Sequence, residues 1–156
     1  MGRSSAVKAI VLAWLIVGIL DLTSAVIIAE TQGHGTLRML QGIASGLLGK
    51  SSFEGGWVTA GLGFVIHFFI ALVVTSIFYF ASRSLTALQR HPVVSGLLYG
   101  IAVYLFMYWV VIPLVFPTSH HSISRDVTAV FVHMFLIGLP ASLIIQRQSR
   151  LPASMS

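Results

Sequence analysis

Four polar side chains stand inside long stretches of sequence that are otherwise apolar. They are Asp21, His67, Tyr108 and His133. Aspartate and histidine can pass protons or bind a cation, and imidazole also ligates haem iron or a transition metal. A tyrosine hydroxyl can share a hydrogen bond with either of them. These four residues are the candidate polar site, and the chemistry open to them depends on the elements that carry them.

The composition of the chain indicates elements that lie in lipid. Of its 156 residues, 56% are hydrophobic and 8% are charged, whereas a soluble domain carries about 25% charged residues. Four charge-poor runs are each long enough to cross a hydrocarbon core of about 30 Å as a helix. They extend over about residues 6–29, 57–80, 93–116 and 126–145. The sequence therefore predicts an all-α protein, a bundle of four transmembrane helices in a single integral membrane domain of residues 1–156.

Basic residues are distributed unevenly between the two ends of these helices. Six lie near the N-terminus, in the 81–91 connection and in the C-terminal tail, and three lie on the other side. Because cytoplasmic segments carry an excess of Lys and Arg, both termini should be cytoplasmic, and the net charge of +5 needs no nucleic-acid partner. The six are Arg3, Lys8, Arg83, Arg90, Arg147 and Arg150, and the three are Arg38, Lys50 and Arg125.

A fifth apolar pattern, over about residues 36–48, has helical spacing but is too short to cross a membrane. We expect a short interfacial helix in the first outer loop, with Thr36 as its N-cap and Gly49 at its end. Gln41 and Ser45 are expected to lie off its apolar side. That side consists of Leu37, Leu40, Ile43, Ala44, Leu47 and Leu48.

The predicted helices place the candidate polar site at one depth. Asp21, His67, Tyr108 and His133 lie about 12, 15, 12 and 10 Å from the outer ends of their helices, within a slab about 5 Å thick. Asp21 should face protein, because a charged residue at that depth costs about 2.5 to 3.5 kcal/mol on insertion scales. Its face of the helix carries three small residues suited to close packing, Gly18, Ser24 and Ala25.

The polar layer has a structural interpretation and several chemical ones. As structure, hydrogen bonds between Asp21, the histidines and the tyrosine would join the helices, each contributing about 0.6 to 2 kcal/mol. As chemistry, Asp21, His67 and His133 could relay protons or bind a cation, as such residues do in transporters. The same three could hold a transition metal, but three ligands in a dry site are few, and no metal site is assigned.

Haem is a further chemical alternative. His67 and His133 could be the two axial ligands of a haem b between the helices at 57–80 and 126–145. Gly63 and Ala71, one turn before and one turn after His67, would leave space for the macrocycle. The propionates would then meet a basic residue at the outer surface, Arg38, Lys50 or Arg125.

The rest of the sequence offers no catalytic machinery. The chain has no cysteine, and no nucleophile–base set, phosphate loop or HExxH motif occurs. His120 and His121 are expected to be solvated in an outer loop. We therefore expect a non-enzymatic membrane protein with a structural or accessory role, whose partners are the lipid bilayer and further copies of the chain or a larger membrane complex. A small transporter or proton-relay element and a haem-binding electron carrier are the alternatives.

Four segments also resemble a known group of proteins. They are LQGIASGLLGKSSFEGG, HFFIA, HPVVSGLLYGIAVYLFMYWVVIPL and HMFLIGLPASLI. Together they are similar to small bacterial inner-membrane proteins whose function is unknown. The resemblance implies a four-helix protein of the bacterial inner membrane, and it assigns no activity, ligand or catalytic residue to any position.

Overall fold

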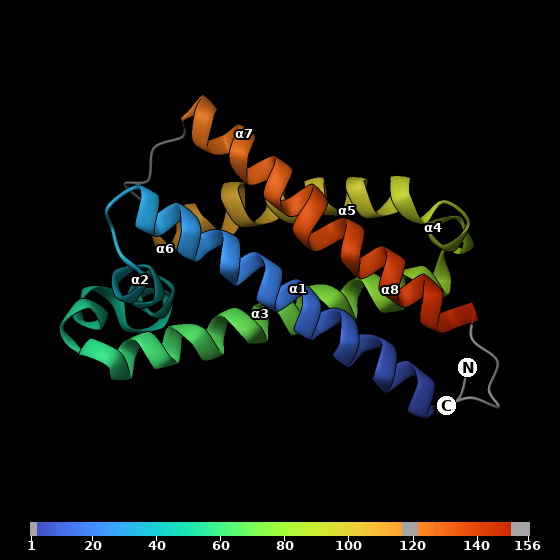
Figure 1. The fold of residues 1–156 in the computed structure, drawn as a ribbon, viewed down its shortest axis with the longest axis horizontal. Coiled ribbons are helices and arrows are strands. Elements are labelled where there is room, and N and C mark those ends of the chain that lie inside the picture. Colours follow the sequence, from blue (N-terminus) through green and yellow to red (C-terminus); the bar gives the residue numbers. More distant parts are fainter. Residues whose placement is uncertain (1–2, 117–121, 151–156) are drawn as a thin grey trace.

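Four long helices run along the molecule in the computed structural model, which describes residues 3–116 and 122–150 (Figure 1). Each is long and apolar enough to cross a membrane, and no strand occurs among the described residues, so the predicted all-α bundle is confirmed. The four are α1 (Arg3–Thr31), α3 (Gly56–Ser84), the stretch of α5 (Pro92–Phe106), η2 (Met107–Val111) and α6 (Ile112–Val115), and the stretch of α7 (Ile123–Val132), η3 (His133–Gly138) and α8 (Leu139–Arg150).

Short elements occupy the two ends of the bundle. α2 (Thr36–Leu48) and the 3-10 helix η1 (Gly49–Glu54) connect α1 to α3 at one end, which we name the α2 end. α4 (Thr86–Arg90) connects α3 to α5 at the opposite end, the α4 end, where α1 begins and α8 finishes (Figure 1). Three of the four long helices extend a few residues past their predicted ends, as in α3, which continues to Ser84, whereas the α5–α6 stretch ends at Val115, one residue before its predicted end. His120 and His121 lie outside the described residues.

α2 has the predicted boundaries, but its N-cap residue differs from the prediction. Gly35 precedes it at φ 76, and Thr36 is its first residue, so the prediction of Thr36 as N-cap is wrong. The backbone N–H and the hydroxyl of Thr36 both donate to Glu30 Oε1, each at 2.7 Å, because the end of α1 brings a carboxylate to this helix terminus. Gly49, at φ 61, donates its N–H to Ser45 O and ends the helix as expected.

The buried side of α2 also differs from the prediction. Gln41 and Ser45 are buried with Leu40 and Ala44, whereas Leu47 is 72% exposed. The cause is the first turn of α3, which offers a hydrogen-bond acceptor: Gln41 Nε2 donates to Gly56 O at 3.1 Å. The polar side chain of Gln41 therefore anchors α2 on α3, whereas the apolar pattern predicted that Gln41 would lie off the packed side of this helix.

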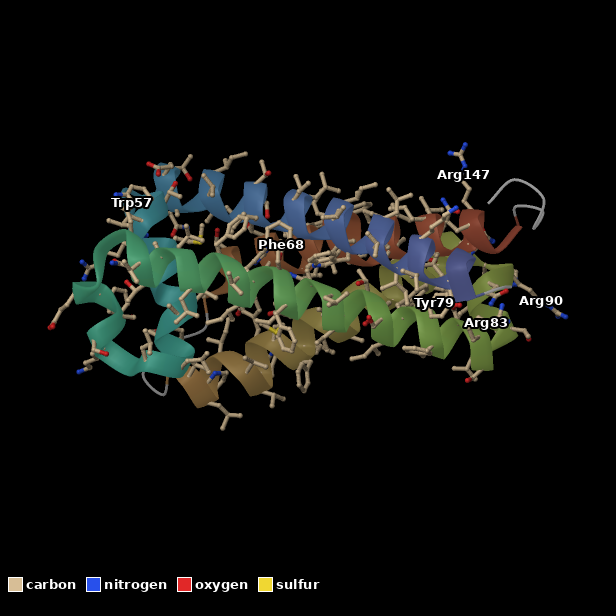
Figure 2. The ribbon with its side chains drawn as sticks, turned by 90° about the horizontal axis from the view of Figure 1, so that it is seen from below. Trp57, Phe68, Tyr79, Arg83, Arg90 and Arg147 are labelled. Carbon is tan, nitrogen blue, oxygen red and sulfur yellow. The ribbon has the colours of Figure 1, made fainter. Side chains whose placement is uncertain are left out.

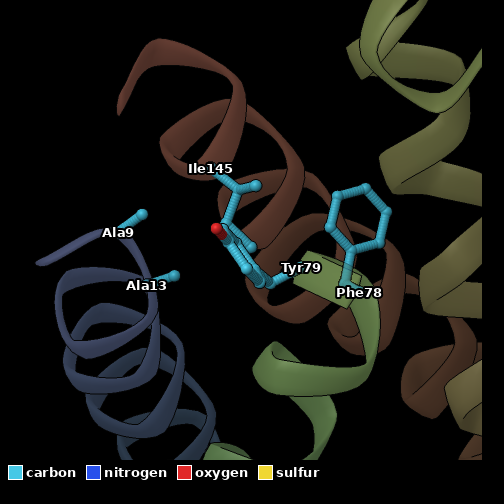
Figure 3. Packing of buried hydrophobic residues seen from close by; sticks show 5 residues of the cluster. All are labelled: Ala9, Ala13, Phe78, Tyr79 and Ile145. Atoms are coloured by element: carbon cyan, nitrogen blue, oxygen red, sulfur yellow. The ribbon is translucent and has the colours of Figure 1, made fainter. Parts of the chain in front are cut away.

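The half of the bundle toward the α4 end is closely packed. Ala9 and Ala13 of α1, each 0% exposed, meet Ile145 of α8 and Phe78 and Tyr79 of α3 (Figure 3). A second buried cluster follows toward the middle, formed by Val17, Ile137 and Ala141. Small residues on α1 and α8 let large side chains interdigitate between the helices, which is how helices associate in lipid.

Two of the long helices contain a π-helical segment, η2 and η3, and each segment precedes a proline. Trp109 in η2 lies four residues before Pro113, and Leu136 in η3 lies four residues before Pro140. A proline has no N–H to donate to the carbonyl four residues back, which accounts for the wider turns at these two places. Single π-helical turns are frequent at functional sites, and these two carry Tyr108 and His133.

Candidate functional site

The four residues of the candidate polar site line one cavity, which we name the central cavity. It has a volume of about 590 Å³ and lies between α1, α2, α3, the α5–α6 stretch and η3. His67 and His133 are buried, at 8% and 9% exposed, and Asp21 and Tyr108 are half-buried. Counted along the observed helices, the four lie about 10 to 16 Å from the α2-end termini of their helices. The structure thus brings together all four residues that the sequence placed at one depth.

A second cavity of about 840 Å³ adjoins the first and opens at the α2 end. Its mouth is polar and basic, with His34, Arg38 and Arg125 among its lining residues. His34 and Arg125 are exposed, so this α2-end cavity communicates with the surface. The residues that line both cavities are Asp21, Ala25, Met39, Gly42, Tyr108 and His133.

The central cavity is closed toward the α4 end. Val17, Val74 and Ile137 form its floor, and the packed side chains of Ala13, Phe78 and Ile145 lie beyond them. The two cavities together therefore lead from the α2-end surface to the middle of the bundle and stop there.

His67 joins α1 to α3. Its Nε2 lies 3.0 Å from Gly18 O, so this nitrogen is protonated and donates a hydrogen bond to the carbonyl. The same nitrogen lies 4.0 Å from Asp21 Oδ2. A Cβ on Gly18 would lie 2.7 Å from the ring of Phe68, so α1 and α3 are in close contact here. The predicted close packing is thus found at Gly18 but not at Ser24 and Ala25, which line cavities instead.

His133 and Tyr108 belong to an aromatic cluster on the other side of the cavity. The ring centroids of Tyr108 and His133 are 5.8 Å apart, and Tyr104 lies 4.8 Å from Tyr108 and 5.9 Å from His133. His133 Nδ1 donates to Ala129 O at 2.8 Å, one turn back on its own helix. In a neutral imidazole this leaves Nε2 as a hydrogen-bond acceptor at the cavity wall.

The polar layer is not a closed hydrogen-bonded network. In residues 3–116 and 122–150, the Asp21 carboxylate and the Tyr108 hydroxyl make no hydrogen bond, and His133 bonds only within its own helix. Of the four, His67 alone hydrogen-bonds to another described helix. The other three present polar atoms to open space.

The residues present do not fit a haem with His67 and His133 as axial ligands. Nε2 of His67 is already committed to Gly18 O. The expected space at Gly63 is filled by the backbone of α2, since a Cβ there would lie 2.8 Å from Leu40 C. Ala71 packs toward Gly18 of α1. The sequence could not show this, because the fold of the α1–α3 connection decides which residues cover Gly63.

Asp21, His67 and His133, the three ligands of the transition-metal alternative, do not come together as a ligand set. Among the described residues, no three His, Cys, Asp or Glu side chains come together in a way that could hold a metal ion.

Several lining residues were missed by the sequence analysis. Met39 and Gly42 of α2 line both cavities, and a Cβ on Gly42 would meet nothing within 4 Å. The glycine at position 42 was a signal of this lining role. Glycine lowers helix stability, so its presence inside a helix suggests that a neighbour approaches closely or that space is needed there.

Comparisons with protein families, with curated proteins and with solved structures found no match.

Proposed function

We propose that this chain is a multi-pass protein of the bacterial inner membrane that binds a small molecule at its intramembrane polar site and has no enzymatic activity. One observation carries the proposal: polar side chains from four separate stretches of helix converge on a cavity of about 590 Å³, a volume typical of small-molecule sites. The resemblance to small bacterial inner-membrane proteins supports the membrane assigned.

The basic residues support an orientation with both termini in the cytoplasm. Arg83, Arg90 and Arg147 gather at the α4 end, and Trp57 lies at the opposite end (Figure 2). An excess of Lys and Arg is typical of the cytoplasmic side. The cavities would then open to the periplasm, and α2 would lie at the outer surface.

A binding role is favoured over a purely structural role for the polar layer. Asp21 at this depth costs about 2.5 to 3.5 kcal/mol on insertion scales, and a structural residue offsets such a cost by hydrogen bonds. Here the carboxylate faces both cavities, with His67 Nε2 at 4.0 Å. Binding is compatible with an accessory role in a larger membrane complex.

Cysteine labelling tests the proposed site without background, because the chain has no native cysteine. Ala25 lines both cavities, whereas Thr23, two residues away on α1, is exposed on the outside of the bundle. A membrane-impermeant maleimide added from the periplasmic side should label Ala25→Cys and leave Thr23→Cys unlabelled. Equal labelling of the two would contradict a water-accessible cavity, and labelling of Ala25→Cys only from the cytoplasmic side would reverse the orientation.

Occupancy can be read from the same variant. A bound molecule should slow the labelling of Ala25→Cys in native membranes compared with delipidated protein. Adding Asp21→Asn should shrink that difference, because the carboxylate lines the site. Identical rates in native membranes and after delipidation would argue against a bound molecule.

Proton or ion transport is a second candidate, favoured by a specific observation. Asp21 and His67 form a 4.0 Å pair at the inner end of the two adjoining cavities, which open at the α2 end and are closed toward the α4 end, as in one state of a transporter. Purified protein in liposomes should then conduct protons or cations, and Asp21→Asn should abolish the flux. A flux that is unchanged in Asp21→Asn would remove this residue from any transport mechanism.

A further inference from the structure

The ring of helices around the central cavity is tight at three contacts. Trp14 Nε1 of α1 donates to Phe68 O of α3 at 2.7 Å. α1 meets the last helix in the buried cluster that contains Val17 and Ile137. α5 meets η3 backbone to backbone, since a Cβ on Gly100 would lie 2.5 Å from Met134 Cα.

The fourth contact, between α3 and α5, is tight only toward the α4 end. There Tyr99 OH donates to Val74 O at 2.7 Å, and its ring packs on Phe78 with centroids 4.9 Å apart. From Val74 toward the α2 end, the facing side chains of the two helices line the central cavity. They are Ile66 and Ile70 on α3 and Val103, Met107 and Val111 on the α5–α6 stretch, and all but Val103 are half-exposed.

α2 covers this gap at the α2 end, where a Cβ on Gly46 would lie 3.6 Å from Val115, and the rest of the gap faces the bilayer. The side chains flanking it on the outside of both helices are large, apolar and exposed, such as Phe69 (63%) on α3 and Phe106 (59%) on α5. A molecule dissolved in the membrane could therefore enter the central cavity sideways, between α3 and the α5–α6 stretch, and meet the polar residues at its inner wall.

The chemistry of the central cavity selects an uncharged head on an apolar tail. Its lining is apolar except at the polar site, and it holds no Lys or Arg. Arg38 and Arg125, which would attract a phosphate, line the α2-end cavity instead. The polar site offers a hydroxyl donor in Tyr108, which suits a ring carbonyl, and acceptors in Asp21 and His133 Nε2, which suit ring hydroxyls.

From these observations we propose that the central cavity binds a quinol or quinone, which enters from the bilayer between α3 and the α5–α6 stretch. The ring lies against Tyr108 and His133, whose faces and edges suit a flat ring. A quinone carbonyl accepts from the Tyr108 hydroxyl, whereas quinol hydroxyls donate to Asp21 and His133 Nε2. The apolar tail lies along Ile70 and leaves through the gap. A volume of about 590 Å³ holds the head and the start of the tail. This inference rests on the proposed function, since it names the ligand class of the same site.

Thermal unfolding of delipidated protein in a mild detergent tests the ligand class. Decylubiquinone in large excess over its Kd should raise the Tm by about 5 °C. The rise should persist in Gly61→Phe and disappear in Gly42→Phe. Both positions are helical glycines at which a Cβ meets nothing within 4 Å, but only Gly42 lines the cavities, so both variants should fold.

Three outcomes would overturn the proposal. One is no rise in Tm with decylubiquinone in the wild type. The second is an equal rise with phosphatidylglycerol, which would indicate a site for a charged headgroup. The third is an equal rise with farnesol, which has an isoprenoid tail and a hydroxyl but no ring. The maleimide labelling of Ala25→Cys does not depend on the ligand, so these results can fail while the cavity itself stands.

A matched pair of tyrosines tests the placement of the head. Tyr108 lines the cavities, and Tyr104 belongs to the same cluster without lining either. Tyr108→Phe removes one hydroxyl and should weaken decylubiquinone binding about five- to tenfold. Tyr104→Phe should leave binding unchanged. Equal affinities in the two variants would remove Tyr108 from the site and with it the proposed orientation of the ring.

Discussion

Replacing Gly63 with alanine should loosen α2 from α3. A Cβ at Gly63 would overlap Leu40 O and would lie 2.8 Å from Leu40 C, whereas nonbonded carbon atoms prefer about 3.5 to 4.0 Å. Both atoms belong to the backbone of α2, so no side-chain rotation can make room. The two helices must therefore move apart by about 1 Å, which strains the hydrogen bond from Gln41 to Gly56 O.

The size of the effect is best read against a matched variant, Gly61→Ala. Gly61 lies two residues earlier on the same helix, and a Cβ there meets nothing within 4 Å. Each substitution gains about 1 kcal/mol of helix propensity, which cancels when the two are compared. Overpacking against a backbone costs about 1 to 3 kcal/mol, so Gly63→Ala should be less stable than Gly61→Ala by that amount.

Unfolding by SDS in mixed micelles, followed by tryptophan fluorescence, measures this difference. Gly63→Ala should unfold at a lower SDS fraction than the wild type, and Gly61→Ala at the same or a higher one. Coincident unfolding curves for the two variants would show that α2 does not rest on Gly63, and the account of both cavities would fall with it, because Met39 and Gly42 of α2 line them.

Two further substitutions test other contacts by the same unfolding measurement. Tyr99→Phe removes the 2.7 Å hydrogen bond to the backbone of α3 and should cost about 1 kcal/mol, and an unchanged stability would mean that this bond does not hold the gap closed toward the α4 end. Asp21→Asn should leave stability unchanged or raise it, because it removes a charge that makes no hydrogen bond in the described part of the chain, and a loss of more than about 1 kcal/mol would identify Asp21 as a structural residue.

The number, type and approximate extent of the long helices could be predicted from the sequence for a physical reason. In lipid every backbone N–H and C=O must be satisfied within the chain, so a charge-poor run of sufficient length has no common alternative to a helix. Small residues mark close helix packing in lipid, and Gly96 and Gly100 of α5 do pack directly on the backbone around Gly138. The ends of the helices could not be predicted to the residue, because polar residues such as Ser82 continue α3 by hydrogen-bonding to its own carbonyls.

The depth of the candidate polar site could also be predicted, since it needs only the rise per residue and the helix ends. The rotation of each helix about its axis could not be predicted. Ser24 and Ala25 were expected to pack against a helix and instead line a cavity, and the haem alternative needed space at Gly63, which instead lies under α2. Both differences have one origin. The pattern of apolar residues in a transmembrane helix does not tell which face contacts other helices, because lipid tails are as apolar as neighbouring side chains.

The two halves of the bundle show that the cavities are not a default result of packing apolar helices. Toward the α4 end, alanines on α1 are matched by large side chains such as Phe78 and Ile145, and the space is filled. Toward the α2 end, α1 again carries small residues at 24 and 25, but no large side chain fills the space beside them. Empty space in a membrane protein forfeits dispersion contacts, and a charge placed beside it adds a further cost. A sequence selected only for a stable bundle would carry leucine at Ser24 and Ala25, so their small size beside Asp21 indicates that the space is kept for an occupant.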